Sequence, residues 1–299
     1  QSLRKIRMEG IDKETINTCY ILNPHRRLLG AISLRRLLLS DPVEKMSNIM
    51  EDHVISVSTR TDQEEVAQLF QKYDFTSIPV VDSENRLVGI ITVDDIVDIL
   101  QQEATEDIEK MAAITPTDKP YMKTGVLETW KKRIPWLLIL MISATFTGKI
   151  ISHYEAALAS YVVLTAFIPM LMDTGGNAGS QASVSIIRGL SLNEIDYGDT
   201  LKILMKEWLV GVLIGATLAA ANFVKLLIID RVTITIAAVV CMTLIVTVIF
   251  AKLVGCSLPI LAKRLGFDPA VMASPFITTI VDALSLMMYF KIAGVILHI

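Results

Sequence analysis

The sequence predicts a multidomain protein, in which an acidic connecting helix joins an α/β domain to an all-α membrane domain of five helices. Charged residues are concentrated in 1–133, whereas long apolar runs recur in 134–299. The mean hydropathy of +0.52 and the 52% of hydrophobic residues are too high for a soluble chain of 299 residues. We expect domain boundaries at 1–101, 102–133 and 134–299.

Composition excludes several classes of protein. The formal net charge of −3 provides no concentrated basic face, so we expect no nucleic-acid partner. The cysteines Cys19, Cys241 and Cys256 match neither a disulfide framework nor a zinc site. The opening QSLRKIRMEG has neither an initiator Met nor an apolar core, so we expect the chain to begin inside a longer protein.

The α/β prediction rests on an internal repeat. RLLGAISLRRLLLSD at 27–41 and RLVGIITVDDIVDIL at 86–100 share one pattern, with Gly30 aligned to Gly89, 59 residues later. Each copy is a short β run, a Ser or Thr suited to cap a helix, and an amphipathic helix. This tandem arrangement resembles a CBS-domain pair, in which the first module is incomplete because its opening strand is missing.

The resemblance to a CBS pair implies a candidate nucleotide site. Such pairs often bind adenine nucleotides through a Ser or Thr and an acid three residues later. Thr92 and Asp95 match that pattern, whereas Ser33 is followed by Arg36. Thr92, Asp95 and Arg35 are therefore candidate contacts for ATP, and whether a nucleotide binds stays open.

An acidic run follows the repeat. Residues 94–109, DDIVDILQQEATEDIE, hold seven acids and no base, and several lie three or four positions apart. On a helix such neighbours repel by a few tenths of a kcal/mol per pair. The run is either a solvated acidic face or a surface that divalent cations neutralise, because hard cations choose carboxylate oxygens.

Five segments are long and apolar enough to cross a bilayer core of ~30 Å as helices. They are 134–152, 157–186, 202–226, 232–255 and 271–297. Lysine and arginine gather before the first segment and in alternate loops, as they do in cytoplasmic loops. The pattern predicts a multi-pass protein of the plasma membrane with its N-terminal domain in the cytosol and its C-terminus outside.

Two polar islands interrupt these apolar segments. The stretch MLMDTGGNAGSQAS at 170–183 predicts a broken, glycine-rich end of the second span that lines a pore with backbone oxygens and Asn177. Asp282 follows Ser274 and Thr278 at helical spacing, and an intramembrane carboxylate indicates a functional site. Gly211 and Gly215 have the spacing of a helix-packing motif.

Asp173-Thr174-Gly175 is also the motif of aspartic proteases. That chemistry needs two carboxylates that share one proton, and the sequence has no second copy of the motif. We therefore predict that the protein is not an enzyme.

The repeat, the acidic helix, five spans, TGGNAGSQAS and FDPAVMASPFITTIVDALSL together resemble the MgtE family of magnesium channels and transporters. The resemblance implies a homodimer in the lipid bilayer, with the pore on its two-fold axis between the second and fifth spans. The implied pore residues for Mg²⁺ are Asp282, Thr278, Ser274, Asn177, Gly175 and Gly176. Asp173 has no place in the family's pattern.

The resemblance also implies cytosolic Mg²⁺ sensing by Glu64, Asp74, Asp95, Asp98, Glu103, Glu106 and Asp107. The expected function is Mg²⁺ uptake down its electrochemical gradient, gated by cytosolic Mg²⁺ bound to these acids. The alternative is a CBS-regulated transporter of Co²⁺, Mn²⁺ or Ca²⁺, since carboxylate sites suit several hard cations. A third class is a membrane-bound regulatory or scaffold protein.

Overall fold

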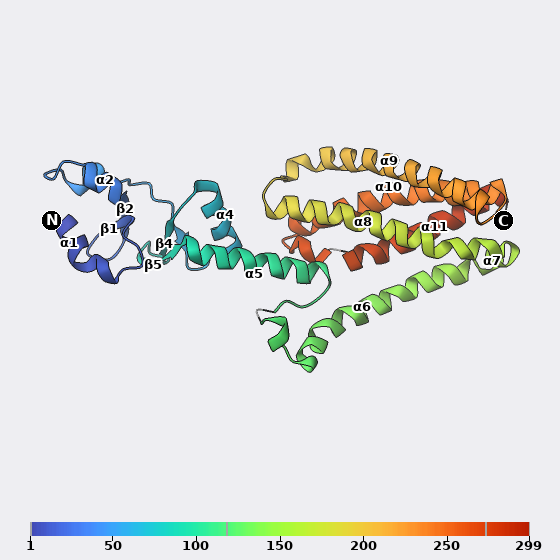
Figure 1. The fold of residues 1–299 in the computed structure, drawn as a ribbon, viewed down its shortest axis with the longest axis horizontal. Coiled ribbons are helices and arrows are strands. Elements are labelled where there is room, and N and C mark those ends of the chain that lie inside the picture. Colours follow the sequence, from blue (N-terminus) through green and yellow to red (C-terminus); the bar gives the residue numbers. More distant parts are fainter. Residues whose placement is uncertain (1, 118, 273, 299) are drawn as a thin grey trace. The chain divides into compact units, whose positions relative to one another are not determined.

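The computed structural model describes residues 2–117, 119–272 and 274–298, without the side chains of residues 156–158, 197 and 274 (Figure 1). The chain divides into two compact units, Gln1–Ala104 and Thr105–Ile299. The first unit is α/β and the second is helical, as the internal repeat and the long apolar runs predict.

The first unit contains two similar halves. The first half is α1 (Ser2–Glu9), β1 (Thr18–Leu22), β2 (Leu28–Ser33), α2 (Leu34–Leu39) and α3 (Met46–Ile49). The second half is β3 (Val57–Ser58), α4 (Gln63–Tyr73), β4 (Ser77–Val81), β5 (Leu87–Thr92) and the start of α5 (Val93–Met111). β1 and β2 form a two-stranded sheet, and β3, β4 and β5 form a three-stranded one.

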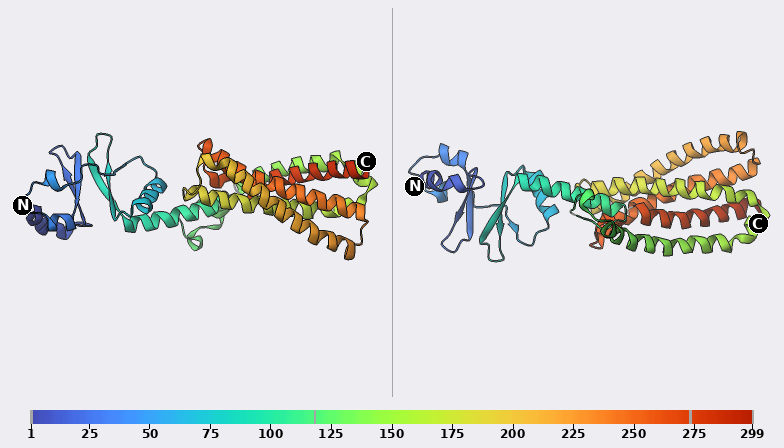
Figure 2. Two further views of the ribbon diagram at one scale, coloured as in Figure 1. Left: turned by 90° about the horizontal axis from the view of Figure 1, so that it is seen from above. Right: turned by 60° about the horizontal axis from the view of Figure 1, so that its bottom comes forward.

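The strand register confirms the internal repeat. In the β1–β2 hairpin Thr18 pairs with Ser33, and in the β4–β5 hairpin Ser77 pairs with Thr92. Ser77 lies the predicted 59 residues after Thr18, and Thr92 lies 59 residues after Ser33. The hairpin turns contact each other, because Leu28 N–H donates to the Asn85 carbonyl at 3.0 Å; Figure 2 shows the two sheets side by side.

The start of α5 follows from its sequence. Thr92 precedes the helix, and its backbone N–H and hydroxyl both donate to Asp95 Oδ2, at 3.3 and 3.0 Å. This contact satisfies a polar group that the helix terminus leaves free. α5 ends at Met111, and Ala113 beyond it has a positive φ of 55°.

The second unit is a helical bundle. Its α-helices are α6 (Val126–His153), α7 (Glu155–Ser160), α8 (Ile168–Ser191), α9 (Thr200–Ile228), α10 (Ile234–Arg264) and α11 (Ser274–Leu297). α8 packs on α10 and α11, α9 packs on α10, and α6 packs on α11. In Figure 1 α6 runs obliquely to the other helices. The α9–α10 contact uses the predicted glycine pair: a Cβ on Gly215 would lie 3.0 Å from the Ile245 Cα.

Four helices among the described residues are long and apolar enough to cross a membrane: Val126–His153, Thr200–Ile228, Ile234–Arg264 and Pro269–Leu297. They correspond to the first, third, fourth and fifth predicted spans. The second predicted span is divided between α7, a 3₁₀ turn at Val162–Phe167, and α8. α8 is less apolar than these four helices because of its polar residues.

The predicted break in the glycine-rich stretch is wrong. α8 runs without interruption through residues 173–183, so its backbone oxygens belong to a helix. The irregular segment lies earlier, at Val162–Phe167. The glycines serve close packing instead: a Cβ on Gly175 would lie 2.7 Å from Thr247 Cγ2, and one on Gly179 would lie 2.9 Å from Ile277 Cγ2. Small residues let helix backbones approach, which keeps this stretch helical.

Candidate functional site

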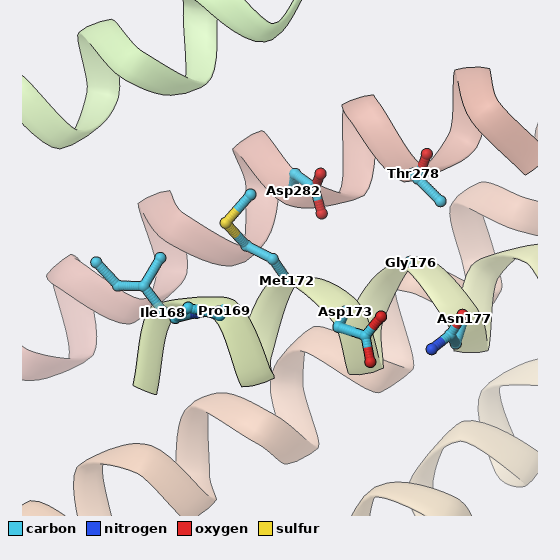
Figure 3. A pocket seen from close by; sticks show the side chains of 8 residues that line it. All are labelled: Ile168, Pro169, Met172, Asp173, Gly176, Asn177, Thr278 and Asp282. Carbon is cyan, nitrogen blue, oxygen red and sulfur yellow. The ribbon is translucent and has the colours of Figure 1, made fainter. Parts of the chain in front are cut away.

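The polar residues of α8 and α11 meet in one pocket of about 440 Å³ (Figure 3). α11 contributes Thr278 and Asp282. α8 contributes Asp173, Gly176 and Asn177. The remaining lining residues also belong to α8 and are Ile168, Pro169 and Met172. Two carboxylates and an amide therefore line a space large enough for a cation with its water shell.

Gly176 allows the two helices to approach at this point. A Cβ at Gly176 would lie 3.0 Å from Thr278 Cγ2, which is tighter than most real Cβ contacts. Thr278 Oγ1 donates to the Pro275 carbonyl at 3.0 Å, which satisfies its proton within α11. Its oxygen keeps a lone pair that a water of a hydrated ion can use.

One face of α8 is polar and exposed on the single chain. Asp173, Asn177, Gln181 and Ser185 recur every four residues, and all four are exposed. The opposite face, with Gly175, is buried against α10 and α11. In a membrane a carboxylate on an exposed face requires water or a protein partner, because hydrocarbon does not solvate it.

The structure brings together four of the predicted pore residues: Asp282, Thr278, Asn177 and Gly176. Gly175 lies outside this pocket, next to Thr247 and Val281, and its predicted role stays a prediction. The side chain of Ser274 lies outside the described residues. Sequence reasoning missed Asp173, although its position four residues before Asn177 placed both on one helix face.

The predicted sensing acids of the first unit lie on α4 and α5. Glu64 is in the first turn of α4, and Asp74 ends that helix with a positive φ of 52°. Gln63 Nε2 on α4 donates to Glu103 Oε1 on α5 at 2.6 Å. Asp95 and Asp98 are exposed in the first turns of α5.

The sensing acids of the second unit already have partners. Glu106 forms an ion pair with Lys110, and Ser191 Oγ donates to Asp107 Oδ2 at 3.4 Å. Lys110 Nζ also lies 2.6 Å from Asp268 Oδ2, in the loop before α11. Burial lowers the pKa of Lys110, but its hydrogen bonds to Asp268 and Glu106 outweigh that and raise the pKa. Lys110 therefore stays charged and links α5 to the loop before α11.

Within residues 2–117, 119–272 and 274–298 there is no group of three or more His, Cys, Asp or Glu side chains that could hold a metal ion. The seven predicted sensing acids are spread along two helices. A cation bound to one of these acids would therefore need further ligands, which are either waters that it retains or acids from another copy of the chain.

The predicted role of the candidate nucleotide contacts stays a prediction, and the nearest pocket of the first unit is lined by other residues. A pocket of about 310 Å³ lies between the two halves of the first unit, with Ser33, Asp74 and Ser77 in its lining. Neither Thr92, Asp95 nor Arg35 lines this pocket. The Thr92 hydroxyl donates to Asp95 instead, so this pair caps α5.

Known proteins match both units. Residues 168–292 match the MgtE family, described as divalent cation transporters, and residues 46–102 match the CBS domain. The magnesium transporter MgtE of Thermus thermophilus is 40% identical over 300 residues, which cover 99% of this chain and 65% of that protein. The chain belongs to the MgtE family. Its family match runs from α8 into α11 and includes the whole pocket of Asp282.

A second MgtE magnesium transporter, from Bacillus subtilis, is 39% identical over 95% of this chain and 62% of its own length. The chain thus spans less than two thirds of the curated MgtE proteins that it matches. A crystal structure of the cytosolic domain of the Mg²⁺ channel MgtE in complex with ATP is 50% identical; the match covers 33% of this chain and 40% of that one, with a TM-score of 0.32. The family itself is described as one of divalent cation transporters, which agrees with the prediction of a protein that is not an enzyme.

Proposed function

We propose that the protein carries Mg²⁺ into the cell, down its electrochemical gradient, through a pore lined by α8 and α11. The observation that carries this proposal is the convergence of Asp282, Thr278 and Asn177 in one pocket beside the exposed polar face of α8. The magnesium transporters that match the chain almost from end to end support it.

The chemistry of Mg²⁺ suits this pocket. Mg²⁺ gives up its waters reluctantly, and proteins usually hold it with one or two carboxylates and several retained waters. A homodimer with the pore on its two-fold axis would supply Asp282 from each subunit. It would also remove the polar face of α8 from lipid. A negative-inside potential then favours inward movement by about 2.3 kcal/mol per charge per 100 mV.

The membrane part of the proposal has five spans, with α8 as the second. Lys131, Lys132 and Arg133 precede the apolar part of α6, and Lys263 and Arg264 end α10. Because such residues mark cytoplasmic ends, the CBS pair would lie in the cytosol and the C-terminus outside, in the plasma membrane. The domains are then a CBS pair with an incomplete first module at 1–101, a connecting segment at 102–133 and a pore domain at 134–299.

Uptake into proteoliposomes tests the proposal and its alternative. The reconstituted protein should admit Mg²⁺ when an inside-negative potential is imposed, and Co²⁺, Mn²⁺ or Ca²⁺ outside should compete weakly. Preferential uptake of one of those ions would favour a transporter of another divalent cation. A protein that moves no divalent cation would fit a regulatory or scaffold role.

The proposed regulation is neutralisation of the acidic α4 and α5 surfaces by cytosolic Mg²⁺, which favours a closed arrangement through differential binding. Replacing both Asp95 and Asp98 by Asn should leave uptake insensitive to Mg²⁺ on the cytosolic side. Asn at 95 keeps an oxygen that accepts from Thr92, so α5 retains its cap.

Glu84→Gln, in the exposed turn between β4 and β5, is the control and should keep the inhibition. Full inhibition of the double variant contradicts this regulation.

We further propose that ATP binds in the pocket between the two halves of the first unit. The hydroxyls of Ser33 and Ser77 and the ring of Tyr20 line it, which offers hydrogen bonds to a ribose and an apolar face to a base. Calorimetric titration of the protein with ATP should give saturable binding that Ser33→Arg weakens at least about tenfold, equivalent to about 1.4 kcal/mol. Unchanged affinity would move the nucleotide elsewhere.

A further inference from the structure

Asp173 and Asp282 lie at the same level of the pocket on two facing helices. α8 and α11 touch where Gly176 meets Thr278. The two helices run antiparallel (Figure 1). One turn towards the N-terminus of α8 and one turn towards the C-terminus of α11 therefore lead in the same direction. Those steps reach Asp173 and Asp282, which both line the pocket in Figure 3.

Neither carboxylate is balanced by a base. No lysine, arginine or histidine is among the residues that line the pocket. Among the described residues, neither Asp173 nor Asp282 has a hydrogen bond or an ion pair. This contrasts with buried Lys252 of α10, which pairs with partly buried Glu207 of α9 at 3.3 Å. Two unpaired acids inside a membrane domain require a mobile positive charge or water nearby.

We propose that Asp173 is a second cation-binding carboxylate of the pore, and that it sets the affinity for divalent over monovalent cations. This inference rests on the proposed transport function, because it concerns the same pocket. In a two-fold dimer the pair becomes four carboxylates around one axis. Asp173 acts on the ion through retained water, since Mg²⁺ keeps most of its shell.

The choice between divalent and monovalent ions follows from charge. Each carboxylate attracts a divalent ion twice as strongly as a monovalent ion at the same distance. Removing Asp173 from both subunits therefore weakens Mg²⁺ binding more than Na⁺ binding. Asp282 remains in the variant, so a cation still has a carboxylate on its path.

The test measures uptake by proteoliposomes of the full chain with Asp173→Asn, Asp173→Glu and Glu155→Gln. Asp173→Asn should raise the half-saturating Mg²⁺ concentration about tenfold, equivalent to about 1.4 kcal/mol. It should also raise Na⁺ permeation relative to Mg²⁺, measured as a shifted reversal potential. Asp173→Glu, which keeps the charge, should restore most of the affinity. Glu155, exposed on α7, is the control carboxylate and its variant should behave as wild type.

The outcomes separate the inference from the function on which it rests. If wild-type protein moves Mg²⁺ and Asp173→Asn has the same half-saturation and selectivity, Asp173 does not bind the ion and this inference fails alone. If wild-type protein moves no Mg²⁺, the transport function fails. If Asp173→Asn does not purify as folded protein, Asp173→Glu takes its place in the test. A wild-type reversal potential of Asp173→Glu supports the role of the charge. A loss of ion selectivity by Asp173→Glu, expressed at the wild-type level, overturns the inference.

Discussion

Asp282→Asn reduces Mg²⁺ uptake by at least about a hundredfold, because each dimer loses two carboxylates, each worth about 1.4 kcal/mol or more to a divalent ion on its path. Asparagine has the same size and keeps one oxygen, so packing between α8 and α11 should be unchanged. Uptake is measured with a Mg²⁺-sensitive dye inside proteoliposomes. The lining of the pocket predicts this effect, since Asp282 is the acid that α11 contributes to it.

The control for this experiment is Glu194→Gln. Glu194 is an exposed carboxylate just beyond the end of α8, outside the pocket, and its variant should transport at the wild-type rate. Both variants should elute from a sizing column as the wild-type protein does. Wild-type uptake by Asp282→Asn would remove this residue from the ion path.

Gly255→Val should abolish the folded bundle. A Cβ at Gly255 would collide with the backbone carbonyl of Gly179, where α10 and α8 touch, and it would lie 2.9 Å from the carbonyl carbon of that residue. A backbone cannot turn away as a side chain can, so we expect a loss of about 3 kcal/mol or more in the free energy of unfolding. The melting temperature in detergent and the yield of monodisperse protein measure this loss.

Gly148→Val is the matched control for that substitution. Gly148 lies in the C-terminal part of α6, and a Cβ there meets nothing within 4 Å. The same branched side chain should therefore be tolerated. Equal melting temperatures for the two variants would show that the α8–α10 contact is looser than this structure has it.

Local patterns in the sequence were sufficient to predict the repeat and the polar face of α11. The spacing of Gly30 and Gly89 predicts two hairpins with one register, because the strands and caps are set by residues close in sequence. The spacing of Thr278 and Asp282 likewise places both on one face, and that face lines the pocket.

The remaining features depend on contacts that are distant in sequence. Glycine has a low helix propensity, so the stretch around Gly175 predicted a break. Only the approach of Thr247 and Val281 explains why it stays helical. Lys110 likewise finds Asp268 across 158 residues, and no local pattern predicts that pair.

The most direct test of the central claim is the accessibility of position 282 in a lipid bilayer. Asp282→Cys is made in a chain whose Cys19, Cys241 and Cys256 are replaced by serine, and a membrane-impermeant cationic thiol reagent is added. The pore account predicts rapid modification that Mg²⁺ slows, together with a disulfide between the two subunits on oxidation. A thiol that stays unmodified at every Mg²⁺ concentration and forms no dimer would place this position in a dry interior, and the account would be wrong.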